Sequence, residues 1–190
     1  MNEQLAWQTA IRKEFKDTID RNVWRFEKIN RIPQNRRLIG SKWIFKKKKN
    51  GVYRARLVAL GYAQIPGIDH IDNFVPVVSE IAFRTILIMG MVYGWSFEIV
   101  DIETAFLYGE LEEEIYMDVP EVLAVYLNTK YDEKDCVILD KSIYGLVQAA
   151  RQFHQKLITV LVKEMKFRIC AGDECLLMRK NDTGTVIICV

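Results

Sequence analysis

One carboxylate stands where a metal ion could be held. Asp101 comes at the C-terminal end of an apolar run, Trp95–Ile102, which is typical of a strand buried on both faces. A compact turning segment follows and closes on Gly109. A carboxylate fixed at the lip of a buried strand can hold a metal ion over a rigid floor, and Glu103, two residues on, could be a second ligand or a solvated residue. The alternative is that Asp101 is an ordinary turn residue at the end of a strand.

A lysine-rich hairpin is the clearest local pattern. Two strand-like runs flank Asn50-Gly51, a pair typical of a tight turn. A two-residue loop would place Lys47 opposite Arg54 and Phe45 opposite Arg56, all on one face. Cations directly opposite each other destabilise a sheet unless an anion lies between them. The pattern therefore favours a nucleotide or nucleic-acid partner, and the alternative is a solvated hairpin whose lysines prevent edge aggregation.

Other elements must position these groups. The spacing of apolar residues predicts an amphipathic helix over residues 3–20. A second helix is expected from Glu80 to about Tyr93, with Ser79 as N-cap and Gly94 as its stop. Because its middle is apolar nearly all round, we expect it to be buried against a sheet. Shorter strands are expected at 115–117, 136–139, 175–178 and 185–190, and a third helix at about 146–165.

Composition excludes several classes of protein. The longest apolar run, Ile86–Tyr93, is too short to span a bilayer, and the N-terminus has no apolar leader segment. The four cysteines lack metal-type spacing and are expected to be reduced, as in an intracellular protein. The net charge of +2 conceals a basic stretch, 28–70, with eleven Lys or Arg, and an acidic stretch, 101–135, with eleven Asp or Glu. A basic lobe favours a polyanionic partner, unless it is only a solvated surface.

Seven short motifs occur in an order that matches a known family. From about Val23 to Val190 the chain resembles the reverse transcriptase domain of copia-type retrotransposon polyproteins. Each motif is weak alone, but seven in order form a specific signal. The motifs are Asn22-Val-Trp24, Lys42-Trp-Ile-Phe-Lys46, Arg54-Ala-Arg-Leu-Val-Ala59, Phe74-Val-Pro-Val-Val78, Asp101-Ile-Glu-Thr-Ala-Phe-Leu-Tyr-Gly109, Leu111-Glu-Glu-Glu-Ile-Tyr-Met117 and Lys141-Ser-Ile-Tyr-Gly-Leu146.

The resemblance implies an α+β fold of the right-hand polymerase type, with fingers and a partial palm built from a mainly antiparallel sheet and packed helices. Residues 1–21 would form an N-terminal helix leading into the domain, and residues 22–190 the fingers and the incomplete palm. The implied activity is RNA- or DNA-templated DNA synthesis with two Mg²⁺ ions. The implied partners are an RNA or DNA template–primer and deoxynucleoside triphosphates, in a cytoplasmic particle or the nucleus and with no membrane partner. The sequence does not indicate an oligomeric state.

The resemblance also assigns roles to individual residues. Asp101 matches the first palm carboxylate, which is both catalytic and metal-binding. A metal pair about 3.5–4 Å apart needs shared carboxylates to activate the primer hydroxyl. Arg56, with Arg54 beside it, is the expected contact to the triphosphate through bidentate hydrogen bonds. The resemblance does not decide which of the two arginines makes this contact. The expected nucleic-acid contacts are Lys46, Lys47, Lys48 and Lys49.

The remaining assignments concern the bound nucleotide. Backbone N–H groups of Thr104 and Ala105 would face the triphosphate. Phe106 would lie under the sugar, where a bulky ring excludes a ribose 2′-hydroxyl. Tyr144 would lie beside the nascent base pair. Both rings could instead be ordinary packing residues.

Two departures from the family pattern bear on activity. The segment Val147–Arg151 reads Val-Gln-Ala-Ala-Arg where the family often has Lys-Gln-Ala-Pro-Arg. Two further palm aspartates are expected in an aromatic-x-Asp-Asp turn just after the strand at 185–190, and the sequence ends there. We therefore expect a truncated fragment of the Pol polyprotein without polymerase activity of its own. The alternatives are a catalytically dead remnant that binds nucleic acid through the hairpin, and an unrelated α+β interaction domain.

Overall fold

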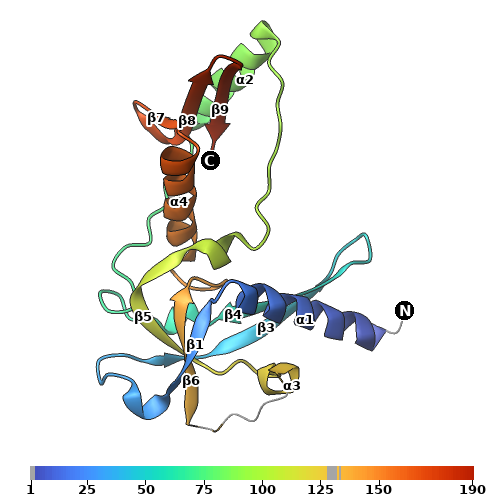
Figure 1. The fold of residues 1–190 in the computed structure, drawn as a ribbon, viewed down its shortest axis with the longest axis vertical. Helices are drawn as coiled ribbons and strands as arrows, with labels where there is room; N and C mark the ends of the chain where they lie inside the picture. Colours follow the sequence, from blue (N-terminus) through green and yellow to red (C-terminus); the bar gives the residue numbers. More distant parts are fainter. Residues whose placement is uncertain (1–2, 128–131, 133) are drawn as a thin grey trace. The chain divides into compact units, whose positions relative to one another are not determined.

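A computed structural model describes residues 3–127, 132 and 134–190, which form a mixed α/β fold (Figure 1). The chain divides into two compact units. The first unit combines residues 1–73 with 104–153, and the second combines 74–103 with 154–190. The four cysteines form no disulfide.

The first unit is centred on a four-stranded sheet with the strand order β1-β6-β5-β2. Strand β6 pairs antiparallel with β1 and β5, and the short β2 pairs parallel with β5. The apolar face packs on the core residues Val23, Ile39, Met117 and Leu139, each no more than 2% exposed. The strands span Trp24–Lys28 (β1), Leu38–Ile39 (β2), Glu110–Asp118 (β5) and Asp135–Lys141 (β6), and the short helix α3 spans Leu123–Leu127.

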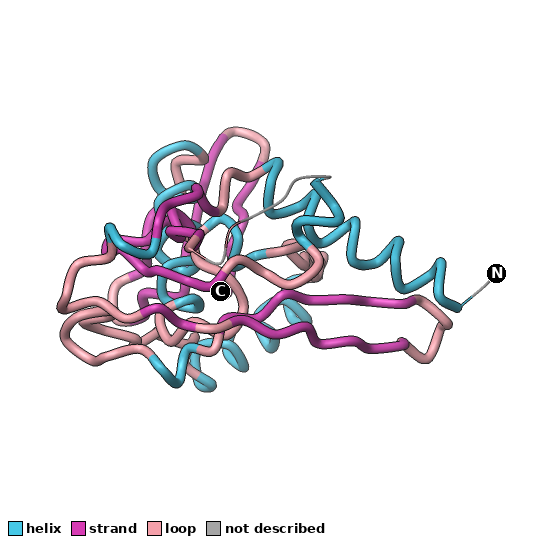
Figure 2. Tube along the Cα trace, turned by 90° about the horizontal axis from the view of Figure 1, so that it is seen from below, coloured by secondary structure: helices cyan, strands magenta, loops and turns pink. Residues whose placement is uncertain are grey.

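The predicted N-terminal helix and the lysine-rich hairpin are both present and pack together. Helix α1 spans Glu3–Asp20, and strands β3 (Ser41–Lys47) and β4 (Tyr53–Ala59) form a two-stranded antiparallel sheet. Figure 2 shows α1 lying along the hairpin. Aromatic rings join them, because Trp7 contacts Tyr53 edge-on at 4.6 Å between ring centroids.

The predicted hairpin register is wrong by one residue. Trp43 pairs with Leu57, Phe45 with Ala55, Lys46 with Arg54 and Lys47 with Tyr53. The loop has three residues, 49–51, because the N–H of Lys48 donates to the carbonyl of Val52 at 2.8 Å and Gly51 adopts a left-handed φ of 80°. A three-residue loop closed by a left-handed glycine is a common alternative to the two-residue turn. Since side chains alternate, the slip moves Phe45 and Arg56 to opposite faces.

The second unit contains two helical segments and a three-stranded antiparallel sheet. Its core is built by Leu161, Phe167 and Leu177. Helix α2 has the predicted bounds, with Ser79 accepting from the N–H of Ala82 and Gly94 in a left-handed C-cap at φ 67°. The elements are α2 (Glu80–Tyr93), α4 (Ala149–Thr159, continued by a π-helix at Val160–Glu164), β7 (Arg168–Cys170), β8 (Asp173–Asn181) and β9 (Gly184–Cys189), with α4 beginning in the first unit.

Two burial predictions in the second unit are wrong. Residues 95–102 form no strand, and Ile99 and Val100 are exposed. A strand requires a partner edge for its backbone hydrogen bonds, and among the described residues no strand pairs with this run. Helix α2 is also largely exposed, with Ile81 79% and Met91 71% accessible. The Phe97 ring presses on Gly90 of α2, and the apolar core of this unit, as far as the structure describes it, contains no side chain of α2.

Strand β5 also differs from its expectation. The strand predicted at 115–117 begins earlier, at Glu110, so the acidic stretch 110–114 is the first half of β5. Glu110 pairs with Lys141 of β6, and an irregularity separates this pair from the regular pairing that starts at Ile115. The weakly patterned stretch 120–134 contains α3, and residues 128–131 and 133 lie outside the described part of the chain.

Candidate nucleotide and nucleic-acid interface

The corrected register separates the hairpin into an aromatic face and a basic face. Trp43, Phe45 and Tyr53 lie on the face that packs against α1, where Phe15 contacts Trp43 at 5.1 Å. The opposite face, called the outer face from here on, carries four cations that α1 does not cover. It consists of Lys42, Ile44, Lys46, Arg54, Arg56 and Val58.

Lys46 and Lys47 are neighbours with different surroundings. Lys47 lies on the α1 side, where its Nζ is 4.7 Å from the Tyr53 ring centroid and 3.7 Å from a Glu3 carboxylate oxygen. Hydrogen bonding to Tyr53, reinforced by Glu3, raises the pKa of Lys47. Lys46 lies directly opposite Arg54, a like-charge pair that favours an anion between them. Within the described part of the chain, no carboxylate forms an ion pair with Lys46 or Arg54.

Three of the predicted nucleotide-binding residues form one stack in the first unit. The Arg56 guanidinium carbon lies 4.5 Å from the Tyr144 ring centroid, a cation–π contact. Tyr144 in turn meets Phe106 edge-on at 5.0 Å. The Nε of Arg56 is buried and has no hydrogen-bond partner among the described residues. Buried donors are nearly always paired. The unpaired Nε–H therefore gives this guanidinium a donor that no described residue uses.

The turn that carries Phe106 is strained and firmly held. Thr104 has a φ of 53°, an outlier for a β-branched residue, and its carbonyl accepts the N–H of Leu107 at 2.8 Å. The carbonyl of Phe106 accepts the hydroxyl of Ser142, and the carbonyl of Gly109 accepts the Ser142 N–H at 2.7 Å. Such strain persists only where neighbouring structure imposes it.

Thr104 and Ala105 are both partly buried where the 3-10 helix Ala105–Tyr108 begins. They precede Phe106 directly in the chain and belong to the same unit.

Asp101 is exposed and lies in the unpaired run of the second unit, not at the lip of a buried strand. Arg56 and Tyr144 belong to the first unit, whereas Asp101 belongs to the second. Among the residues that the structure describes, no three His, Cys, Asp or Glu side chains are grouped as metal ligands.

A buried carboxylate supports the hairpin from the α1 side. Glu14, 7% exposed, accepts the backbone N–H of Leu57 at 3.1 Å. Burial raises the pKa of Glu14, and the opposing effects of that hydrogen bond and of Arg54 and Arg56 are smaller. No sequence pattern predicts this contact, because an acidic residue in an amphipathic helix is usually solvated.

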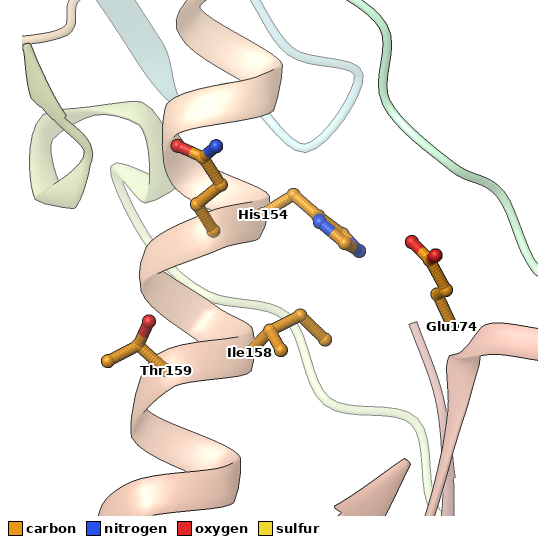
Figure 3. Close-up of a pocket in the computed structure, with 5 residues that line it drawn as sticks. His154, Ile158, Thr159 and Glu174 are labelled. Atoms are coloured by element: carbon orange, nitrogen blue, oxygen red, sulfur yellow. The ribbon is translucent and has the colours of Figure 1, made fainter. Parts of the chain in front are cut away.

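The second unit has an open hollow, and its lining contains none of the residues predicted for the site (Figure 3). It is an open concavity of about 500 Å³ where α4 meets β8, lined by His154, Ile158 and Glu174 among others. The Sγ of Cys175 lies 3.7 Å from the Nε2 of His154. Burial lowers the pKa of the imidazole and raises that of the thiol, so both stay neutral and the pair is not an activated nucleophile.

Comparison with known proteins decides the family. Residues 21–190 match the family described as reverse transcriptase (RNA-dependent DNA polymerase). The chain belongs to this family. The resemblance drawn from the seven motifs is confirmed, and the unrelated interaction domain is excluded.

The relatives of this reverse transcriptase fragment are copia-type polyproteins. It is 38% identical over 167 residues to the retrovirus-related Pol polyprotein from transposon TNT 1-94 of Nicotiana tabacum, covering 85% of this chain and 12% of that protein. It is 35% identical to the Pol polyprotein from transposon RE2 of Arabidopsis thaliana, covering 82% and 11%. It is 28% identical to the truncated transposon Ty1-A Gag-Pol polyprotein of Saccharomyces cerevisiae, covering 100% and 15%. No solved structure matches.

The chain therefore spans about an eighth of the length of the tobacco relative. In the described residues, no helix is both long and apolar enough to cross a membrane.

Proposed function

We propose that this chain supplies the fingers and part of the palm of a right-hand RNA-directed DNA polymerase, with residues 1–21 as a leading helix and 22–190 as the polymerase part. In the complete polyprotein it would bind a template–primer and a deoxynucleoside triphosphate, within a cytoplasmic particle or the nucleus. The observation that carries this proposal is the stack of Arg56, Tyr144 and Phe106, which joins a cation with unused donors to two aromatic rings.

The stack suits a nucleotide on chemical grounds. Arg56 can offer parallel N–H groups to a phosphate, and aromatic rings can pack against a base or a sugar. Of the two arginines, Arg56 is the better candidate for the triphosphate, because it is the one held beside Tyr144. Thr104 and Ala105, which precede Phe106 directly, would offer their backbone N–H groups to the same ligand.

The outer face of the hairpin suits a nucleic-acid backbone. Lys46 and Arg54 form a cationic pair whose mutual repulsion a phosphate would relieve. Lys48 and Lys49 lie exposed at the tip and extend the same positive surface. Lys47 contributes less in this proposal, because it is already engaged by Glu3 and Tyr53.

The residues present do not fit a complete pair of Mg²⁺ ions. Two catalytic cations require several shared carboxylates, whereas Asp101 is the one residue that matches a palm ligand. No group of three suitable side chains exists among the described residues. We therefore propose Asp101 as a single contributor to a catalytic metal site, and we propose that these 190 residues alone do not extend a primer.

The test of the interface uses two adjacent lysines as a matched pair. An RNA–DNA hybrid is titrated with the unchanged chain, Lys46→Ala and Lys47→Ala over a range of salt concentrations. Both variants lose one charge, but only Lys46 lies on the outer face. We expect Lys46→Ala to reduce the slope of log K against log salt by roughly 0.7–0.9, the contribution of one phosphate contact. Lys47→Ala should leave that slope nearly unchanged.

An equal loss in both variants, or in neither, would contradict binding through the outer face. Primer extension measured on the same samples separates the polymerase from the second candidate, a remnant that only binds nucleic acid. Extension by the 190-residue chain would overturn the proposal that it is inactive alone. Extension by a longer polyprotein fragment that fails after Asp101→Asn would support the polymerase role. A longer fragment that binds the hybrid but never extends it would favour the remnant.

A further inference from the structure

A buried network of side-chain amides lies next to the nucleotide stack. Gln64 is 7% exposed and Gln148 1% exposed. The Nε2 of Gln64 donates to the Oε1 of Gln148 at 3.0 Å, and the Nε2 of Gln148 donates to the carbonyl of Asp69 at 2.9 Å. The bond joins residues 84 positions apart in the sequence. Gln148 therefore accepts from Gln64 and donates to the backbone of Asp69, inside the first unit.

At its other end, the network includes an ion pair between Asp69 and Arg36. Asp69, 2% exposed, accepts the N–H of Ile65 at 2.7 Å through its Oδ2. Its Oδ1 lies 3.5 Å from an Arg36 nitrogen, and Arg36 also donates to the carbonyl of Ile68 at 2.6 Å. These bonds hold residues 65–69, which follow Gln64 directly, against Arg36.

The near end of the network holds the turn that carries Tyr144. The Oε1 of Gln64 accepts the N–H of Val147 at 2.9 Å, and the carbonyl of Tyr144 accepts the N–H of Ala59 at 2.8 Å. Between these bonds, Gly145 approaches its neighbours so closely that a Cβ on it would lie 2.2 Å from the carbonyl oxygen of Ala59. The turn is therefore bonded on one side to β4, the strand of Arg56, and on the other side to Gln64.

We propose that Gln64 is a positioning residue for nucleotide binding, holding the 144–147 turn against β4 so that the Tyr144 ring lies over Arg56 before a nucleotide arrives. The proposal rests on the function proposed above for that pair. Gln64 is suited to the role because one amide both donates to Gln148 and accepts from the turn. An apolar side chain of equal size could fill the space but would leave the Val147 N–H without a partner.

The test replaces Gln64 by glutamate, which cannot donate a hydrogen bond to Gln148 when it is ionised but can donate one when it is protonated. In Gln64→Glu, an ionised carboxylate still accepts from Val147 but meets the Oε1 of Gln148 without a hydrogen between them. A protonated carboxyl group donates to Gln148 again, and burial favours that form as the pH falls. The other charged or titratable groups that face this site are Asp69, Arg36 and His70, so each measurement is divided by that of the unchanged chain at the same pH.

Binding of dATP in the presence of Mg²⁺ is measured at about pH 8 and about pH 5.5. We expect Gln64→Glu to bind dATP on the order of tenfold more weakly at the higher pH, the usual effect of leaving one buried group unpaired. Relative affinity should recover at the lower pH. Gln34→Glu adds the same charge at an exposed position, so its affinity for dATP should equal that of the unchanged chain at both pH values.

Two further readouts distinguish positioning from general support of the fold. Gln64→Glu should still bind the RNA–DNA hybrid through Lys46 and Arg54, because these two residues of the outer face do not depend on the 144–147 turn. The NMR signals of the Arg56 side chain, shifted by the Tyr144 ring and assigned by their change in Tyr144→Leu, should lose that shift at the higher pH and regain it at the lower one. Unchanged dATP binding together with unchanged Arg56 signals would overturn the proposal.

Failure of the proposed function would look different. If the unchanged chain binds no dATP, the nucleotide role of the stack fails, and the Arg56 signals alone decide whether Gln64 positions Tyr144. If Gln64→Glu does not fold at the higher pH, the double variant Gln64→Met with Gln148→Met takes its place, because removing both partners leaves neither amide unpaired. Weaker dATP binding without recovery at low pH then supports the proposal, and unchanged binding overturns it.

Discussion

Replacing Glu14 by glutamine should stabilise the protein at neutral pH. The side chain is buried between α1 and β4 and accepts the N–H of Leu57 at 3.1 Å. Glutamine keeps an acceptor oxygen for that bond and removes the cost of burying a negative charge. Burial raises the pKa of Glu14 in the folded state, so protonation favours folding.

The sign of the pH dependence follows from that direction. A raised folded-state pKa contributes stability that is fully present below the unfolded-state value and is lost as the pH rises through the folded-state value. At a pH above the folded-state pKa the unchanged chain has lost this contribution, and each pKa unit of the shift corresponds to about 1.4 kcal/mol. Glu14→Gln should therefore gain stability at pH 7, and the difference should shrink toward pH 4.

The assay is urea unfolding followed by circular dichroism at several pH values. Glu14→Leu is the matched control, because it also removes the charge but leaves the Leu57 N–H unpaired, at a cost of about 1–3 kcal/mol. The reasoning is refuted if Glu14→Gln is the less stable protein at pH 7. That result would mean that attraction from Arg54 and Arg56 outweighs the desolvation of the carboxylate.

Two further predictions concern packing around the same hairpin. Phe15 is fully buried and contacts Trp43 edge-on, so Phe15→Ala should lower the free energy of unfolding by about 3–5 kcal/mol in the same urea assay. Gly145 has a φ of 91° and no room for a Cβ beside Ala59, so Gly145→Ala should cost at least about 1–3 kcal/mol. Gly51→Ala, at a left-handed position with open space around it, is its control and should cost less. Equal costs at the two glycines would show that the close approach at Gly145 is unimportant.

The sequence predicts those elements whose signals are local. Helix α2 begins and ends where Ser79 and Gly94 indicate, because a capping side chain and a left-handed glycine act within one turn. The hairpin also forms as its residues suggest. Its register was mispredicted, because Asn50-Gly51 is compatible with loops of two or three residues and one step reverses every side chain.

Features that depend on distant residues could not be predicted in this way. The run that ends near Asp101 has the composition of a strand, but a strand also needs an edge to pair with, which composition does not specify. The bond between Gln64 and Gln148 joins residues 84 positions apart, and no local pattern pairs the loop of Gln64 with the segment that precedes α4. Phe106 and Tyr144 contact each other edge-on, and no local pattern links them; only the family resemblance assigned both to a bound nucleotide.

The observed register changes which hairpin residues are available to a ligand. The predicted face that would join Phe45 with Arg54 and Arg56 does not exist. Helix α1 covers the aromatic face, and the cations of the outer face are left for a ligand. Helix α1 therefore determines which side of the hairpin is available for binding.

The central claim is that Arg56 binds the triphosphate of a nucleotide stacked beside Tyr144. The most direct measurement is the affinity of dATP, in the presence of Mg²⁺, for the unchanged chain, Arg56→Ala and Arg31→Ala. Arg31 is the control, because it is exposed and pairs with Glu27 within its own turn. We predict a loss of roughly 10- to 150-fold for Arg56→Ala, the equivalent of one or two hydrogen bonds to a charged group, and no loss for Arg31→Ala. Equal affinities for all three proteins would contradict the account.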